Sequence, residues 1–150
     1  MLYSRSCEHA IRALTYLAAR PVGELCLVDE IVRSESVPRQ YTTKILGDLV
    51  KIGILTSTRG RLGGYALARD PGEVSLLEIM RAIDGPDRIE RCAVGLEPCD
   101  DHVPCALHDE FRPLREAIRA YLETTTLDTM AEALERKRAQ LDNIRGRELP

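Results

Sequence analysis

The sequence has no tryptophan and a single phenylalanine, Phe111, among its 150 residues. Proteins that bind single-stranded nucleic acid stack the bases on aromatic side chains, so this shortage argues against that class. No apolar run approaches the ~18 residues that a membrane-spanning helix needs, which excludes a transmembrane role. The first residues, MLYSRSCEHAIRAL, lack the apolar segment of a secretory signal peptide. We therefore expect a cytoplasmic protein without a membrane partner.

Enzyme motifs are also missing. The sequence contains no G-x-S-x-G motif and no phosphate-binding loop. Gly60, Gly63 and Gly64 form a glycine-rich stretch, but it lies between two predicted strands and not ahead of a helix, where a nucleotide phosphate would be held. We expect no catalytic residues and no small-molecule substrate.

The charges are unevenly distributed along the chain. The formal net charge is −3, but residues 1–70 hold ten Lys and Arg against seven Asp and Glu, whereas residues 71–150 hold eleven against seventeen. A basic region within an acidic protein is expected where a polyanion binds. A chance excess on a solvated face would look the same, so charge alone does not decide between the two.

Hydrophobic periodicity predicts three helices followed by a hairpin in residues 1–70. The helices span about 7–19, 28–33 and 38–52, and the strands about 54–58 and 65–68. In the third helix we expect Tyr41, Ile45 and Leu49 to face the core. This order predicts a mainly α protein with a small β wing, in which residues 1–70 form a winged helix-turn-helix domain.

The second half, residues 71–150, is predicted to be helical apart from one loop. Ser75 and Glu78 form a capping box that opens a helix ending near Ile83. An irregular loop follows, and then two helices at about 105–123 and 127–144, the second capped by Thr126. Pro113 should kink the first of these two helices or mark a late start, since an interior proline costs ~3 kcal/mol.

Three of the five cysteines lie in the loop, and a histidine follows them. Cys92, Cys99, Cys105 and His108 have the spacing C-x6-C-x5-C-x2-H. Their flanking residues are too polar for a core, and a disulfide is not expected in a reducing compartment. These residues therefore predict a metal or cluster site. Cys7 and Cys26 lie within or beside helical patterns and are expected to be packing residues.

The identity of the metal stays open at this point. Three cysteines and one histidine are a legitimate set of ligands for structural zinc. Thiolates also hold iron–sulfur clusters, in which a histidine can replace a cysteine. Structural zinc loops usually contain a close Cys pair, and gaps of six and five favour a larger inorganic core. The spacing thus leans toward an iron–sulfur cluster, with zinc as the alternative.

Several segments together resemble the IscR/NsrR-type winged-helix transcriptional regulators of the Rrf family. The most specific match combines the wing string Arg59-Gly60-Arg61-Leu62-Gly63-Gly64-Tyr65 with the three spaced cysteines. Further matches are Tyr16-Leu17-Ala18, Tyr41 with Ile45-Leu46, residues 49–55, Ser75-Leu76-Leu77-Glu78-Ile79, Ala82-Ile83-Asp84 and Thr126-Leu127.

This resemblance implies a homodimeric regulator, such as a repressor, that binds duplex operator DNA. Its affinity for the operator would depend on a [2Fe–2S] or [4Fe–4S] cluster. The cluster would sense iron, redox or nitric oxide status. Cys92, Cys99 and Cys105 would be cluster ligands. The fourth would be His108, or Glu8 from the partner subunit. Residues 71–150 would then comprise the cluster loop, about 86–108, and the dimerisation helices. The first cysteine gap of six, where five is commoner, and Pro113 depart from the family pattern.

The predicted third helix would enter the major groove. Its residues Arg39, Gln40, Thr43 and Lys44 would face base edges or phosphates, because arginine and glutamine suit contacts with guanine and adenine. Arg59 and Arg61 on the wing would reach the backbone or the adjacent minor groove. A competing interpretation is a winged-helix regulator, or an interaction module that has this fold, with a structural zinc site and no cluster sensing.

Overall fold

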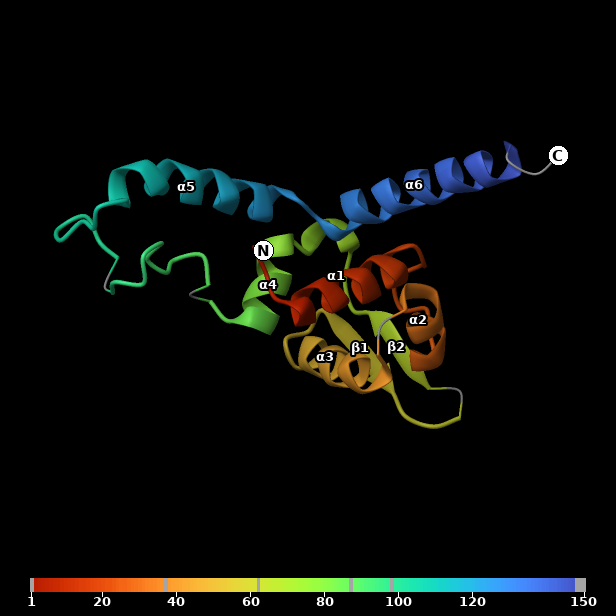
Figure 1. Cartoon of the computed structure of the whole chain (residues 1–150). Helices are drawn as coiled ribbons and strands as arrows, with labels where there is room; N and C mark the ends of the chain where they lie inside the picture. Colours follow the sequence, from red (N-terminus) through yellow and green to blue (C-terminus); the bar gives the residue numbers. More distant parts are fainter. Residues whose placement is uncertain (1, 37, 62, 87, 98, 148–150) are drawn as a thin grey trace.

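The structure is a computed structural model that describes residues 2–36, 38–61, 63–86, 88–97 and 99–147 (Figure 1). Its first three helices confirm the predicted order: α1 (Arg5–Ala18), α2 (Val28–Glu35) and α3 (Arg39–Lys51). Ser4 caps α1, since its side chain accepts a hydrogen bond from the Cys7 backbone N–H. α2 is followed by its C-cap Ser36, whose φ of 51° turns the chain sharply before α3.

A two-stranded antiparallel sheet forms the wing. β1 (Leu55–Thr58) pairs with β2 (Gly64–Leu67), with Leu55 opposite Leu67. Cys26 adds an isolated bridge to Tyr65, with backbone hydrogen bonds of 2.9 Å in both directions. A Cβ on Gly64 would lie 2.3 Å from the Cys26 carbonyl oxygen, so this close approach of two backbones requires glycine.

The second half contains a short 3-10 turn, η1 (Pro71–Glu73), and the helices α4 (Leu76–Asp84), α5 (His108–Thr124) and α6 (Leu127–Arg147). The predicted cap is confirmed, since Ser75 accepts a hydrogen bond from the Glu78 N–H at 3.2 Å. Pro113 lies inside α5, and the helix continues through it. The mainly α fold with a β wing is therefore as predicted.

One hydrophobic core joins the two halves of the chain. α1 crosses its centre and packs against α2, α3, α4 and α6. The side chains of Leu14, Leu46, Met80, Leu122 and Leu127 are all fully buried. The core thus extends beyond residue 70, and α4 and the start of α6 are part of the same packed body as the winged helix.

Two expectations about individual residues have different outcomes. Cys7 and Cys26 are buried at 0% and 1% exposure, which confirms them as packing residues. Tyr41 was expected in the core, and this is wrong, because it is 58% exposed. The buried stripe of α3 begins instead at Thr42 and continues through Ile45, Leu46 and Leu49.

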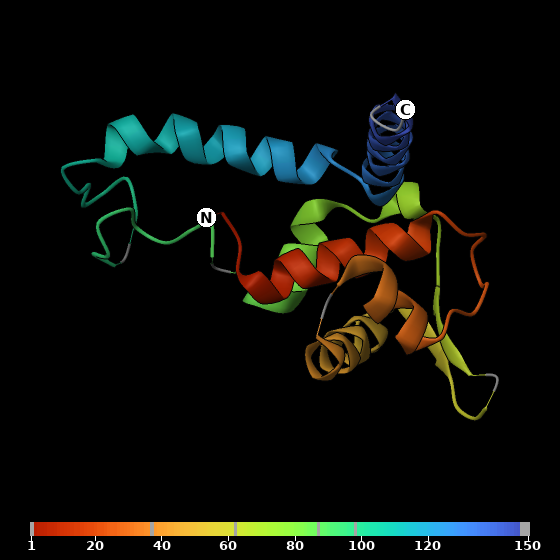
Figure 2. The same ribbon diagram turned by 45° about the vertical axis from the view of Figure 1, so that its right-hand side comes forward.

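The elements are arranged on two sides of α1. Figures 1 and 2 show α3 and the wing on one side, and α5 and α6 on the other. α5 extends away from the body, and the cysteine loop lies at its far end. Within the described residues, no helix is long and apolar enough to cross a membrane.

Candidate nucleic-acid interface and metal centre

The first two turns of α3 expose a polar face. Since Thr42, Ile45, Leu46 and Leu49 fill the buried side, the remaining positions point away from the core. They are Arg39, Gln40, Tyr41, Thr43 and Lys44, and all five are exposed. Four of them are the residues predicted to contact DNA, and the structure brings them onto one face. Tyr41 joins them as a residue that the sequence assigned to the core.

The wing lies beside the start of α3. A cleft of about 410 Å³ separates them and is lined by Arg39, by Arg59 and Gly60 of the hairpin loop, and by Leu27 and Asp29 of the α2 region. Arg59 and Arg61 are exposed at the tip of the hairpin. Arg39 of α3 and Arg59 of the wing therefore line the same cleft, and α3 and the wing lie on the same side of α1 (Figure 2).

Asp29 is an additional residue at this interface that the sequence did not single out. Its carboxylate forms an ion pair with Arg39 across the gap between α2 and α3. Both side chains are more than half exposed. The pair gives the Arg39 guanidinium, the group with which arginine binds guanine, a partner on α2. No pattern in the sequence marks this pair, because the two residues lie in different helices.

The cysteine loop brings the predicted ligands together as two pairs. The Sγ atoms of Cys92 and Cys105 lie 3.6 Å apart, and Cys99 Sγ lies 4.0 Å from His108 Nδ1. All three cysteines line one cavity of about 230 Å³. Among the described residues, no group of three or more His, Cys, Asp or Glu side chains could hold a single metal ion. The donors are thus near one another but not gathered around one point.

His108 is positioned by the backbone and by Asp101. As the first residue of α5, it donates its backbone N–H to the Cys105 carbonyl at 3.0 Å. Its Nε2 lies 2.7 Å from Asp101 Oδ1, and this hydrogen bond lowers the pKa of the Asp101 carboxyl. If Nε2 donates to the carboxylate, Nδ1 is left with a lone pair on the side of Cys99. A carboxylate on the far nitrogen is the usual partner of a metal-binding histidine.

Two arginines of α5 fasten the loop to the helix. Arg115 donates to the Arg91 carbonyl at 3.1 Å and lies 3.2 Å from Cys99 Sγ. Arg119 donates to both carboxylate oxygens of Glu90 at 2.6 Å. Helical periodicity could have identified Arg115, since it lies seven residues after His108 and therefore on the same face of α5.

The thiols differ in their electrostatic surroundings. Backbone N–H groups, first that of Val94 and then that of Leu96, lower the pKa of Cys92. Burial raises the pKa of Cys7 to about 12, and burial together with a hydrogen bond to Glu30 raises that of Cys26 to about 11. Ionisation is thus favoured at Cys92 and disfavoured at Cys7 and Cys26.

Glu8, the alternative fourth ligand, lies elsewhere in the chain. It lines a separate cavity of about 450 Å³ with Tyr3 and Ile11 at the start of the chain and with Tyr121 of α5. Glu8 is not among the residues that line the cavity of the three loop cysteines. Its predicted role as a ligand from a partner subunit stays a prediction.

Comparisons with known proteins agree with this architecture. A family model, Rrf2, described as an iron-dependent transcriptional regulator, matches residues 3–133. An HTH-type transcriptional regulator of Mycobacterium tuberculosis is 38% identical over 151 residues, covering 99% of this chain and 93% of the relative. An rrf2-like HTH-type regulator of Rhodobacter capsulatus is 31% identical, covering 88% and 93%.

Solved structures share the fold. CymR, the global cysteine regulator of B. subtilis, superposes with a TM-score of 0.72 at 24% identity, covering 87% of this chain and 95% of CymR. IscR of T. potens gives a TM-score of 0.63 at 23% identity, covering 87% and 86%. The chain belongs to the Rrf2 family, and it is accordingly a DNA-binding transcriptional regulator and not an enzyme.

Proposed function

We propose that this chain acts as a homodimeric repressor that reads duplex operator DNA with α3 and the wing. Residues 1–70 supply the DNA contacts, and residues 71–150 supply the dimer contacts and an iron–sulfur centre that adjusts affinity. The observation that supports this most directly is that Arg39 of α3 and Arg59 of the wing line one cleft, with α3 and the wing on the same side of α1 (Figure 2). The wing and the first turns of a recognition helix bind adjacent parts of one duplex.

Each exposed side chain of the interface suits a particular part of the duplex. Arg39 and Gln40 carry the forked groups that recognise guanine and adenine in the major groove. Thr43 and Lys44 lie one turn further along α3, where they suit base edges or phosphates. Arg59 and Arg61 suit the phosphate backbone or the minor groove, so binding should weaken steeply with salt.

The dimer is supported by apolar side chains that α5 and α6 leave in water. Leu114 and Tyr121 on α5 are 58% and 51% exposed, and Leu141 and Ile144 on α6 are 43% and 54% exposed. Large apolar side chains gathered on projecting helices are typical of a surface that another chain covers. We expect a second copy of the chain to cover this surface. The two half-sites of a palindromic operator need two recognition helices, one from each copy.

The donor set of the cysteine loop fits an iron–sulfur centre. Two thiolates on one tetrahedral metal with bonds of about 2.3 Å lie roughly 3.8 Å apart, close to the observed 3.6 Å between Cys92 and Cys105. The second pair, Cys99 and His108, is similarly spaced at 4.0 Å. Two pairs suit a centre with more than one metal better than a single zinc ion. The state of such a cluster in the loop would respond to redox conditions and to nitric oxide.

The chain's own residues would link that state to the DNA-binding half. Asp101 fixes the orientation of His108, and Arg115 holds Cys99 against α5. Since His108 is the first residue of α5, a change in its position acts on the helix that carries the proposed dimer contacts. Glu8 of a partner remains the alternative fourth ligand, and zinc the alternative metal.

Selection of duplexes from a random pool, with protein purified anaerobically, tests the function. We expect a palindromic duplex to be enriched, and Arg39→Ala to relax preference at one base pair of each half-site. Lys51→Ala, an exposed cation paired with Asp48 at the far end of α3, is the matched control. Recovery of no preferred duplex would favour the interaction module.

The same preparation distinguishes the metals. An iron–sulfur centre absorbs visible light, whereas zinc is colourless. Replacement of Cys92, Cys99 or Cys105 by alanine should abolish the colour, and Cys26→Ala should keep it. A colourless protein with one equivalent of zinc after anaerobic reconstitution would establish the zinc alternative.

A further inference from the structure

Glu35 is a buried carboxylate at the joint between α2 and α3. It is the last residue of α2, and its side chain is only 6% exposed. The chain turns at Ser36, and Pro38 is the N-cap of α3. A buried carboxylate is costly unless charged or hydrogen-bonding groups surround it. The groups that contact the Glu35 carboxylate therefore help to fix the connection between α2 and α3.

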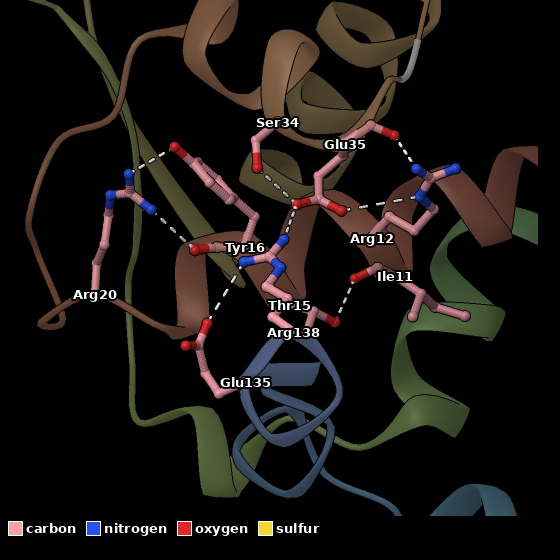
Figure 3. A network of polar contacts seen from close by, with 9 residues as sticks. All are labelled: Ile11, Arg12, Thr15, Tyr16, Arg20, Ser34, Glu35, Glu135 and Arg138. Carbon is pink, nitrogen blue, oxygen red and sulfur yellow. Dashed lines mark hydrogen bonds and ion pairs between the residues drawn. The ribbon is translucent and has the colours of Figure 1, made fainter. Parts of the chain in front are cut away.

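Groups from three helices hold this carboxylate (Figure 3). Arg138 of α6 donates from Nη2 to Oε1 at 2.7 Å, and Ser34 of α2 donates to the same oxygen at 2.9 Å. Arg12 of α1 lies 3.9 Å from Oε2 and also donates to the Glu35 backbone carbonyl. Glu35 is thus the point where α1, α2 and α6 meet through polar contacts.

Arg138 anchors the outer half of α6. The start of α6 packs on the core through apolar residues, among them Leu127 and Ala131, which are 0% and 7% exposed. Further along, the helix exposes Leu141 and Ile144. Arg138 lies between these regions, and its ion pair with Glu35 joins the outer half of α6 to the last residue of α2.

We propose that Glu35 and Arg138 are positioning residues for DNA binding. Their ion pair ties α6 to the turn that precedes α3, so that movement of α6 changes how α3 meets the duplex. This inference rests on the proposed DNA-reading role of α3. It extends that role by naming the contact through which the second half of the chain acts on it.

The physical basis is that the contact between the buried Glu35 carboxylate and the partly exposed Arg138 guanidinium is either formed or broken. If α6 moves away, Glu35 keeps Ser34 and the more distant Arg12 but loses its closest cation. A buried carboxylate that loses its nearest cation is less well compensated, which disfavours that arrangement. The joint would then rearrange or take up water, and α3 would lose its fixed entry angle. A contact with two discrete states, formed and broken, can transmit a movement of one helix to a distant helix.

The test compares four full-length variants on the duplex that the wild-type protein enriches most strongly. Glu35→Gln and Arg138→Met each remove the ion pair, and a double variant removes both partners. Arg136→Met is the control, because Arg136 is two residues away, exposed, and paired with Glu132 at 3.5 Å. We expect each single change to weaken binding roughly 5- to 20-fold. The double variant should be no weaker than the worse single variant, and the control should stay within about twofold.

Two further measurements separate positioning from other roles. If Arg138 instead touched a phosphate, its loss would lower the salt slope of binding by about one; a positioning residue leaves that slope unchanged. Hydrogen exchange of the outer half of α6 in DNA-free protein should quicken in both single variants and not in Arg136→Met.

Three results would overturn the inference: unchanged affinity in stably folded single variants, additive losses in the double variant, or a reduced salt slope for Arg138→Met. If Arg39→Ala relaxes base preference while the Glu35 and Arg138 variants bind normally, the inference fails and the proposed function stands. If the wild-type protein enriches no duplex, both fail.

Discussion

Cys26 and the loop cysteines show how surroundings set the chemistry of a thiol. Cys26 is buried beside β2, and its pKa is raised to about 11, first by burial and then by its hydrogen bond to Glu30. Because the thiolate is the reactive form, a raised pKa leaves little nucleophile at pH 8. Cys105, by contrast, is partly exposed.

We therefore expect iodoacetamide at pH 8 to modify Cys105 of the metal-free protein well before Cys26. The rate at Cys26 should rise about tenfold with each pH unit toward its pKa, since the thiolate fraction rises in that proportion. Peptide mass spectrometry over a time course measures both sites. In urea-unfolded protein, the two should react alike. Equal reactivity of both sites in the folded protein would contradict the expectation.

Asp101 is expected to decide which nitrogen of His108 carries the proton. Asp101→Ala should raise the fraction of the tautomer protonated on Nδ1, which nitrogen-15 NMR of metal-free protein measures directly. In reconstituted protein it should shift the visible spectrum as His108→Ala does, because Nδ1 would no longer be presented as a ligand. Asp109→Ala, an exposed neighbour, is the control. An unchanged tautomer in Asp101→Ala would show that the 2.7 Å contact does not orient the ring.

At the scale of elements, glycine residues in the wing allow the hairpin to expose two arginine side chains. Gly64 permits the close approach to Cys26, and the hairpin loop then exposes Arg59 and Arg61. Replacing either arginine by alanine should weaken operator binding, by roughly 1–3 kcal/mol if that arginine reads a base. If both contact phosphates, the loss should be similar for all sequences and the salt slope should fall by about one for each. Unchanged affinity would exclude the wing from the interface.

α5 contains an unfavourable residue whose cost can be measured. Pro113 cannot donate a backbone hydrogen bond to the Asp109 carbonyl, and it is exposed, so no buried contact of its side chain offsets the loss. Pro113→Ala should raise the free energy of unfolding by about 1–3 kcal/mol, measured by urea titration at fixed protein concentration.

Pro71→Ala is the matched control for this substitution. Pro71 opens the turn η1, where a missing N–H leaves no intrahelical bond unmade, so its replacement should not stabilise. A gain of equal size in both variants would point to a general effect of proline on the unfolded chain.

At the scale of the whole molecule, the two projecting helices are expected to meet a second copy. Leu114→Glu and Tyr121→Glu place a charge on the apolar surface of α5, and either should convert a dimer into a monomer at micromolar concentration. Analytical ultracentrifugation measures this directly. Leu25→Glu changes a residue of similar exposure, 41%, that lies in the loop before α2 and away from α5, and it should leave the dimer intact. A wild-type monomer would refute the homodimer.

The sequence alone determined the order of elements and named the residues that are proposed to contact DNA. Amphipathic periodicity, the capping box at Ser75 and the glycine-rich hairpin are local signals, and each produced the helix, cap or strand that it predicts. The loop cysteines were likewise recognised as candidate ligands from their spacing, because they lie close together in the sequence. These features could be predicted because their causes lie within a few residues of one another.

Only the tertiary structure decided which side chains meet across the fold. Glu35 and Arg138 are 103 residues apart, and nothing local to either marks the pair. Asp101 becomes a partner of His108 because the loop folds back onto α5. Tyr41 follows the apolar period of α3 and yet is exposed, while its neighbour Thr42 is buried. Burial and ion pairing depend on how distant segments pack, and a one-dimensional pattern does not contain that information.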